Sequence, residues 1–175
     1  MKVFKPKEYY KSIFDINYSK LKKNNIKLII FDLDNTILEV DKDLPKKEVK
    51  DLITKLKKDF IVVVASNNVK QRVRKVSEYL ECDNLYSIGK PSKKIKKFID
   101  KRYGIDTLNC TIIGDQIVTD IFMGNRLSMH TILIDPIASK DLKVTYFNRF
   151  LEKIILKIIK LKRGDYYQWK VISIV

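Results

Sequence analysis

The sequence predicts an α/β protein built on a Rossmann-like parallel sheet that is flanked by helices. Short apolar runs such as Phe60–Ala65 are typical of buried parallel strands. Segments with apolar residues at helical spacing, such as Val69–Leu80, alternate with these runs along the chain. This alternation favours a single parallel sheet with right-handed crossovers and helices on both of its faces.

The elements follow one another without a linker, a repeat or a low-complexity tract, so one domain spans residues 1–175. Strands are expected at residues 27–32, 60–65, 85–88, 110–113 and 130–134. Helices are expected at residues 45–58, 69–80, 92–103, 117–127 and 145–163. Pro45 stands near the start of the first of these helices, Ser92 can cap the third, and Gly104 ends it. Residues 1–26 form an N-terminal extension with one short helix around Ser19–Lys23.

The composition indicates a soluble globular protein. Hydrophobic residues make up 45% and charged residues 33% of the 175 positions. No apolar run approaches the roughly 20 residues that span a bilayer, and the N-terminus lacks the apolar core of a signal peptide. Cys82 and Cys110 are isolated and are expected to be reduced thiols. We therefore expect a cytoplasmic protein.

The net charge of +15 is compatible with three kinds of anionic partner: nucleic acid, an anionic membrane surface or a phosphorylated substrate. The lysines accompany many Asn and Ile residues, a bias that codon composition alone can produce. The charge therefore favours an anionic partner without choosing one.

Two carboxylates follow the first predicted strand. Alternate side chains of an extended strand share a face, so Asp32 and Asp34 can reach the same bound group. Two like charges so close together require a divalent cation between them or a proton on one of them. Ordinary turn chemistry, which also favours Asp, is the alternative for this pair alone.

Three further strand ends carry polar residues in the same way. The four sets are Asp32-Leu33-Asp34-Asn35-Thr36, Ser66-Asn67, Lys90-Pro91 and Gly114-Asp115 with Asp120. Parallel strands bring their carboxyl ends to one edge of the sheet, which is where ligands bind in open α/β folds. The sequence therefore predicts one site that combines carboxylates, a hydroxyl group and a lysine.

This ordered quartet resembles motifs one to four of the haloacid dehalogenase-like phosphatase superfamily. The further segments Gly124-Asn125-Arg126, Pro136-Ile137 and residues 148–152 resemble its IIIA type and the YqeG-like branch. That branch also contains mitochondrial phosphatidylglycerophosphate phosphatases. The resemblance implies a Mg²⁺-dependent phosphomonoester hydrolase, with phosphatidylglycerophosphate as the best single guess for its substrate.

The resemblance also implies a role for each residue. Asp32 would attack phosphorus and become an aspartyl phosphate, while Asp34 would protonate the leaving oxygen and later activate water. Mg²⁺ would bind Asp32, the backbone carbonyl of Asp34 and Asp115. The remaining residues would support this centre: Ser66, Asn67 and Lys90 at the phosphate, and Asp120 and Thr36 behind the metal ligands.

Each supporting residue also has a structural alternative. Ser66 could cap the following helix, and Asn67 could shape a loop without touching substrate. Lys90 is one lysine among many, and Asp120 could be a solvated helix residue. The single histidine, His130, precedes a strand and is expected to be structural.

The spacing between the strand ends leaves no room for a cap domain, because one helix and one strand account for each interval. An uncapped site stays open to a phosphate on a lipid or a macromolecule. The helix predicted at residues 145–163 has an apolar stripe beside a basic face, which is typical of an interfacial helix on the inner face of a membrane. A helix packed on the core, with its basic side in solvent, is the alternative.

Two other functions stay open at this stage. One is phosphatase activity on a protein, a nucleic-acid end or a small metabolite. The other is a basic polyanion- or RNA-binding module with a vestigial site, which the intact acidic residues and the sparse aromatic–lysine interleaving disfavour. The sequence indicates no oligomeric state.

Overall fold

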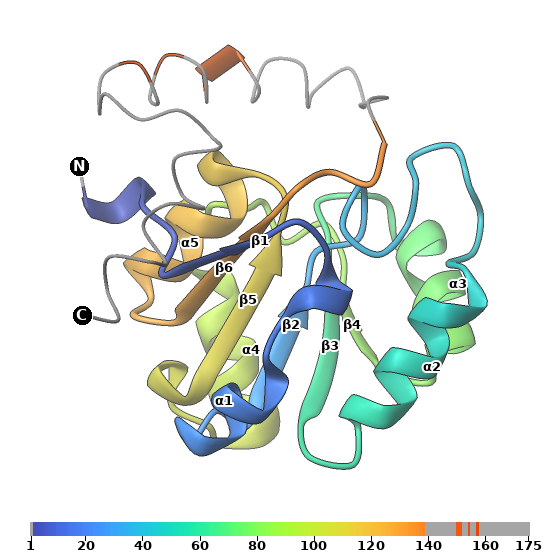
Figure 1. Cartoon of the computed structure of the whole chain (residues 1–175), viewed down its shortest axis with the longest axis horizontal. Helices are drawn as coiled ribbons and strands as arrows, with labels where there is room; N and C mark the ends of the chain where they lie inside the picture. The colour runs from blue at the N-terminus through green and yellow to red at the C-terminus, as the bar shows by residue number, and fades with distance from the viewer. Residues whose placement is uncertain (1, 139–149, 152–153, 155–156, 158–175) are drawn as a thin grey trace.

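In the part of the chain that the structure describes, six short segments form one parallel sheet, in the order β1-β6-β5-β2-β3-β4 (Figure 1). The structure is a computed structural model, and it describes residues 2–138, 150, 151, 154 and 157. The strands are β1 (Glu8–Tyr10), β2 (Leu28–Phe31), β3 (Ile61–Ala65), β4 (Asp83–Leu85), β5 (Cys110–Gly114) and β6 (His130–Ile134). The predicted α/β class with a parallel sheet is confirmed.

Helices and helical turns connect these strands. The longer ones are α1 (Tyr18–Lys23), α2 (Lys47–Leu56), α3 (Lys70–Leu80), α4 (Lys94–Tyr103) and α5 (Phe122–Arg126). The short turns are η1 (Lys2–Phe4), η2 (Ile13–Asp15), η3 (Thr107–Asn109) and the π-helical turn η4 (Ile117–Ile121). Within residues 2–138, the segments between β2 and β3 and between β3 and β4 each contain one helix and its loops. The structure therefore has no cap domain at these two positions, as predicted.

The sheet separates two apolar cores. On one face, Phe31 and Val64 pack with side chains from α1, α2 and α3, among them Val73. On the other face, Ile30 and Ile112 pack with side chains from α4 and α5. Successive strand residues thus bury opposite faces, which explains why β2 is apolar at every position. Figure 1 shows the helices in these two layers.

The central strand β2 lies between β5 and β3. The chain runs outward from β2 through β3 to β4, and then returns to β5 on the other side of β2. Such a reversal of strand order opens a crevice at the carboxyl ends of the strands. The residues after β2 and β5 therefore lie at the position where an α/β sheet binds its ligand.

Most predicted elements differ from the observed ones by one or two residues at an end, and Lys93 rather than Ser92 is the N-cap residue of α4. Two predicted elements differ more. The strand expected at residues 85–88 is β4, Asp83–Leu85, which pairs in parallel with Val63–Ala65. Its later residues form a loop because Ser87 and Gly89 adopt left-handed backbone conformations. The helix expected at residues 117–127 is divided into the π-helical turn η4 and the short helix α5.

The N-terminal segment contributes a strand that the sequence analysis did not predict. Strand β1 pairs in parallel with β6, with Tyr9 opposite Leu133. The Phe4 ring stacks on Phe122 at 4.7 Å between ring centroids, and the Asn125 side-chain amide donates to two backbone carbonyls of the segment. The segment is therefore integrated into the domain. Its short helix α1 is capped by the Asn17 side chain.

The helix predicted at residues 145–163 lies mostly outside the described residues. The four described residues in this range are helical, and Phe150 and Ile154 are exposed. In the part of the chain that the structure describes, no helix is both long enough and apolar enough to cross a bilayer. The choice between an interfacial helix and one that packs on the core stays a prediction.

Candidate active site

Asp32 directly follows the central strand and continues its hydrogen bonding. Its backbone N–H donates to the Ile113 carbonyl at 2.9 Å, which fixes the chain between β2 and β5. The side chain is 8% exposed and contacts Lys90. The carboxylate is therefore held rigidly at the edge where the sequence placed it.

Lys90 joins two of the strand ends through its ammonium group. Its Nζ donates to Asp32 Oδ1, to Asp120 Oδ1 at 2.7 Å and to the Ala65 carbonyl at 3.0 Å. Only 2% of the side chain is exposed. Burial lowers the pKa of Lys90, but the two carboxylates outweigh burial and raise it, so this lysine stays charged. A buried cation here distinguishes Lys90 from the many surface lysines.

Asn67 positions Lys90 through its backbone. The Asn67 side chain accepts from the Lys90 N–H at 2.6 Å and donates to the Lys90 carbonyl at 3.1 Å. This double hydrogen bond resembles a rung of a sheet ladder, and it links the loop after β3 to the loop after β4. It matches the loop-shaping alternative for Asn67, and its contact with phosphate stays a prediction.

Three buried carboxylates lie together beside Lys90. Oxygens of Asp32, Asp115 and Asp120 all lie within 4.8 Å of one another. Burial raises the pKa of Asp32 well above its usual value; Lys90 opposes this shift, while Asp120 and Asp115 add to it. One lysine does not balance three carboxylates, so the cluster suits a divalent cation, and hard oxygen ligands are those that Mg²⁺ prefers. The donor set therefore fits the metal that the sequence predicted.

Gly114 makes space for Asp120. A Cβ atom on Gly114 would overlap the Asp120 carboxyl group. The Asp120 side chain is fully buried and accepts from the Gln116 N–H and the Thr119 hydroxyl, both at 3.3 Å. This burial excludes the alternative that Asp120 is a solvated helix residue. The π-helical turn η4 thus directs a carboxylate inward to the cluster.

Ser66 directly follows strand β3 and is buried. Its Oγ accepts from the Asn68 N–H at 3.0 Å, which tightens the turn after the strand. Helix α3 begins later, with Val69 as its N-cap residue, so Ser66 does not cap that helix. The role of Ser66 at the phosphate stays a prediction.

The Asp34 side chain is outside the three-carboxylate cluster and faces helix α3. Its Oδ1 accepts from Arg72 Nε at 3.2 Å and from Arg72 Nη2 at 2.9 Å. Its Oδ2 accepts from the Asn68 side-chain amide at 3.1 Å. The prediction assigned the backbone carbonyl of Asp34 to the metal, and this orientation of the side chain is compatible with it.

Sequence reasoning missed Arg72 and Asn68. One signal was available: Arg72 has no carboxylate three or four residues away along α3, so its partner had to come from elsewhere in the fold. No such signal existed for Asn68, because the contact depends on how the loop after β3 folds.

Thr36 follows Asn35, whose positive φ of 60° turns the chain sharply after Asp34. Thr36 is fully buried, and its Oγ1 has no hydrogen-bond partner among the described residues. It lines a cavity rather than contacting the three carboxylates. Its predicted place behind the metal ligands stays a prediction.

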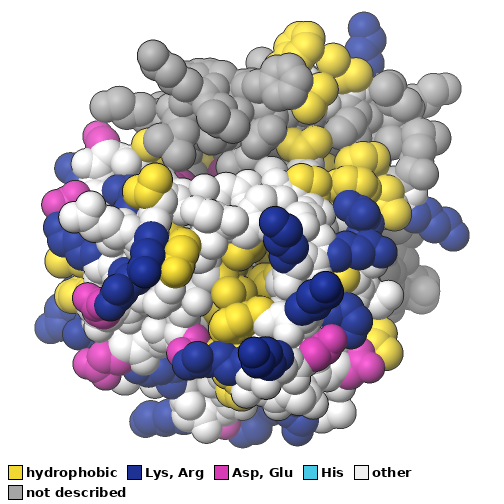
Figure 2. Space-filling view, turned by 180° about the vertical axis from the view of Figure 1, so that it is seen from behind, with side chains coloured by type: hydrophobic (Ala, Val, Ile, Leu, Met, Phe, Trp, Pro, Cys, Tyr) yellow, Lys and Arg dark blue, Asp and Glu magenta, His cyan; other side chains and the backbone are white. Residues whose placement is uncertain are grey.

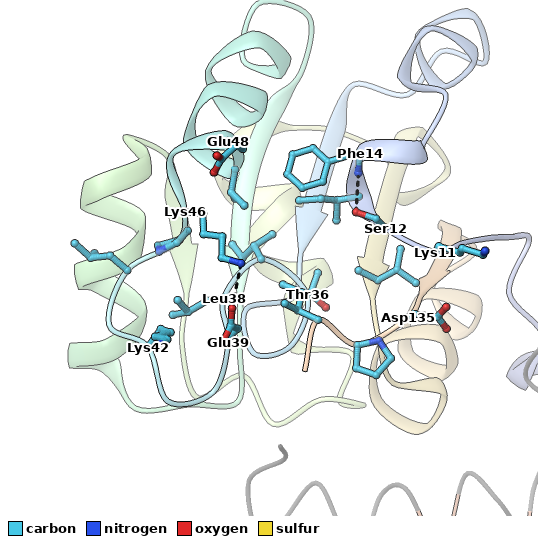
Figure 3. A pocket seen from close by; sticks show the side chains of 18 residues that line it. Lys11, Ser12, Phe14, Thr36, Leu38, Glu39, Lys42, Lys46, Glu48 and Asp135 are labelled. Atoms are coloured by element: carbon cyan, nitrogen blue, oxygen red, sulfur yellow. Dashed lines mark hydrogen bonds and ion pairs between the residues drawn. The ribbon is translucent and has the colours of Figure 1, made fainter. Parts of the chain in front are cut away.

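This cavity has a volume of about 490 Å³ (Figure 3). Its walls are mainly apolar, and three lysines and three acidic residues also line it. Lys46 among them pairs with Glu39 at 3.4 Å. The loop of residues 36–39 forms one wall, and this loop follows Asp34 directly in the chain. The cavity and the strand-end site are therefore connected through one loop.

Comparisons with known proteins agree with this fold and site. A family model described as haloacid dehalogenase-like hydrolase matches residues 37–127. The chain is 39% identical over 170 residues to the probable phosphatase YqeG of Bacillus subtilis (strain 168), a match that covers 97% of this chain and 98% of that protein.

Two solved structures share the fold at low sequence identity. One is an uncharacterized protein from Listeria monocytogenes serotype 4b, with a TM-score of 0.52 and 19% identity over 66% of this chain and 84% of that one. The other is a haloacid dehalogenase family enzyme from Bacteroides thetaiotaomicron, solved with magnesium and inorganic phosphate. Its TM-score is 0.51, and it is 14% identical over 69% of this chain and 99% of its own chain. Together with the family model and the curated relative, they show that the chain belongs to the haloacid dehalogenase-like hydrolases, in the YqeG-like phosphatase branch.

Proposed function

We propose that the protein is a Mg²⁺-dependent phosphomonoester hydrolase that works through an aspartyl-phosphate intermediate on Asp32. One observation carries this proposal: Lys90 links Asp32 to Asp120 within a buried cluster of three carboxylates at the carboxyl edge of the sheet. This arrangement combines a fixed nucleophile, a buried cation and a donor set for a divalent metal. The Bacteroides thetaiotaomicron enzyme, solved with magnesium and phosphate, supports the choice of metal.

The residues divide the reaction between them. An Asp32 oxygen forms a bond to phosphorus as the bond to the leaving oxygen breaks, and Asp34 gives that oxygen a proton. Water then attacks phosphorus, Asp34 takes up its proton, and the Asp32–phosphorus bond breaks to release phosphate. Asp32, Asp115 and the Asp34 carbonyl would hold Mg²⁺, which when bound would neutralise charge on the nucleophile and the phosphoryl oxygens. Lys90 and the Ser66 hydroxyl contribute hydrogen bonds to those oxygens.

The nearby cavity supports an amphiphilic substrate. Its walls are mainly apolar, and its charged lining residues are three lysines and three acidic residues. The loop at residues 36–39, which lines it, follows Asp34 directly in the chain. The segments between β2 and β3 and between β3 and β4 contain no cap domain, which favours access by a large substrate. We therefore infer a phosphorylated lipid head group as substrate, with phosphatidylglycerophosphate as the best single guess.

Exposed apolar side chains support peripheral contact with an anionic membrane. Leu44, Val69, Tyr86 and Ile137 are exposed, and each belongs to a loop that follows the carboxyl end of a strand. Contact through these loops would bring the uncapped site to the lipid surface. Nucleic acid is a weaker candidate, because lysines and arginines are scattered among apolar side chains on the face in Figure 2 and do not form one basic patch there.

A phosphate-release assay with Mg²⁺ tests the proposal. The panel comprises phosphatidylglycerophosphate in mixed micelles, 4-nitrophenyl phosphate, sugar phosphates and a 5′-phosphorylated oligonucleotide. We expect Asp32→Asn to lower turnover at least ~1,000-fold while the protein stays folded, because the nucleophile is lost. Asp59→Asn, which changes a half-exposed aspartate in an ion pair with Lys22, is the matched control.

The panel separates the chemistry from the substrate. Preferred turnover of the lipid supports the head-group assignment, whereas preferred turnover of another substrate class refutes it and keeps the phosphatase chemistry. If Asp32→Asn retains wild-type turnover, the aspartyl-phosphate mechanism is wrong. Polyanion binding that survives Asp32→Asn, without turnover of any substrate, would favour the binding module.

A further inference from the structure

We propose that Arg72 is a positioning residue, which holds the Asp34 carboxyl group in its reactive orientation and ties it to the loop at residues 39–42. The inference rests on the proposed phosphatase function, in which Asp34 serves the leaving oxygen. It concerns a residue outside the four strand-end motifs.

The guanidinium group of Arg72 makes four hydrogen bonds. Nε and Nη2 both donate to Asp34 Oδ1, at 3.2 and 2.9 Å. Nη1 donates to the Lys42 carbonyl at 2.8 Å, and Nη2 also donates to the Glu39 carbonyl at 3.2 Å. A planar fork of five N–H groups can span these acceptors, whereas a lysine ammonium concentrates its donors at one point.

Both oxygens of Asp34 are thereby fixed from the same segment of chain. Arg72 holds Oδ1 and the Asn68 amide holds Oδ2, and both residues follow strand β3. Ser66, proposed to bind the phosphoryl group, directly follows the same strand. The segment from Ser66 to Arg72 therefore sets the Asp34 carboxyl group relative to the phosphate site.

The position of Arg72 points to this role rather than to general stability. Helix α3 is anchored to the core by Val73, Val76 and Leu80, which are fully buried. The Arg72 side chain is only 20% exposed and faces Asp34, which is 11% exposed. Removing the guanidinium group leaves the apolar anchor of the helix intact and releases Asp34 and the loop.

The leaving group provides a selective test. If Asp34 is misoriented, it protonates the leaving oxygen less effectively in the transition state. The rate then falls more for a substrate with a poor leaving group than for one with a good leaving group. Steady-state kinetics are measured with phenyl phosphate, which has a poor leaving group, and with 4-nitrophenyl phosphate, which has a good one. The variants are Arg72→Ala and Arg72→Lys. Arg74→Ala is the control on the same helix, because Arg74 is exposed and pairs with Glu78.

We expect Arg72→Ala to lower kcat for phenyl phosphate ~10- to 100-fold and for 4-nitrophenyl phosphate less than ~3-fold, with KM within ~3-fold in both cases. Arg72→Lys is expected to recover part of the loss, and Arg74→Ala to behave as wild type. Equal losses on both substrates, or a change in KM alone, would overturn the proposal. If Arg72→Ala does not fold, the same comparison is made with Arg72→Lys.

A crystal structure of a folded Arg72 variant gives a second readout that is independent of activity. We expect the Asp34 side chain to turn away from its wild-type rotamer and residues 39–42 to shift. An unchanged Asp34 rotamer would overturn the proposal even if the kinetics change. Absence of phosphate release from the wild type would instead refute the proposed function, and this structural result would still decide the role of Arg72 in orienting Asp34.

Discussion

Two buried carboxylates, Glu8 and Asp32, show how the surrounding groups decide what a buried acid does. Their side chains are equally buried, at 7% and 8% exposure. Burial raises the pKa of both, but Glu8 is surrounded by donors from His130, Tyr10 and Lys20, which lower its pKa to about 2. Asp32 has Lys90 and two further carboxylates as neighbours, and its pKa is raised. The donors around the first carboxylate favour its charged form, whereas the second lies in a cluster of acidic residues that suits a divalent cation.

The response to Mg²⁺ should differ most between variants at the Asp32 cluster and variants at Glu8. We expect a chelator to lower turnover at least ~100-fold, and saturating Mg²⁺ to raise the melting temperature of the wild type by several degrees, since a ligand at ~100 times its Kd contributes about 2.7 kcal/mol. Asp115→Asn should abolish both responses, while Glu8→Gln should retain them. Calorimetry with and without Mg²⁺ measures the shift, and an undiminished shift in Asp115→Asn would contradict the proposed metal site.

A methyl group at Gly114 should displace the Asp120 carboxyl group from the cluster around Asp32. We expect Gly114→Ala to cost about 2–4 kcal/mol in unfolding free energy and at least ~10-fold in kcat/KM, because the new Cβ overlaps Asp120. Gly104→Ala is the control: that residue has φ of +62° with open space around its Cβ position, so it should cost about 1 kcal/mol and leave activity unchanged. Urea denaturation and kinetics of both variants make the comparison, and equal activities would contradict it.

The Glu8 network should show a smaller effect, confined to stability. Because the pKa of Glu8 is lower in the folded protein than the usual 4.5, its contribution is complete above about pH 4.5 and is lost as the pH falls towards 2. We expect Glu8→Gln to destabilise the protein by roughly 2 kcal/mol at pH 7, with the difference from wild type shrinking below pH 4.5. Denaturation across this pH range measures it.

The control for Glu8 is Asp43→Asn, which removes an exposed partner of Lys75 and should change stability little. A constant difference between Glu8→Gln and wild type from pH 7 to pH 2 would contradict the assigned cause. Turnover at neutral pH should match that of the wild type in both variants, because neither residue belongs to the cluster of Asp32, Asp115 and Asp120.

The sequence predicted the Asp32 cluster far better than the surroundings of Asp34. Asp32 and Asp115 directly follow β2 and β5, and parallel strands bring their ends together whatever the loops do. Lys90 lies beyond the loop after β4, and the Asn67 side chain holds it in place. The contact of Arg72 with Asp34, in contrast, depends on the rotation of α3 and on the path of the loop at residues 39–42. Strand β1 was missed because its three residues, Glu8–Tyr10, give no alternating pattern long enough to distinguish a strand from a loop.

Strand β1 has one more consequence, for self-association. It covers the outer side of β6, whose five residues His130–Ile134 would otherwise present unpaired N–H and C=O groups along an apolar strand. Among the described residues, the sheet ends instead in a strand of three residues between Lys7 and Lys11. Short edges flanked by lysines are poor templates for pairing with another chain, so the N-terminal segment protects the domain from edge-to-edge aggregation.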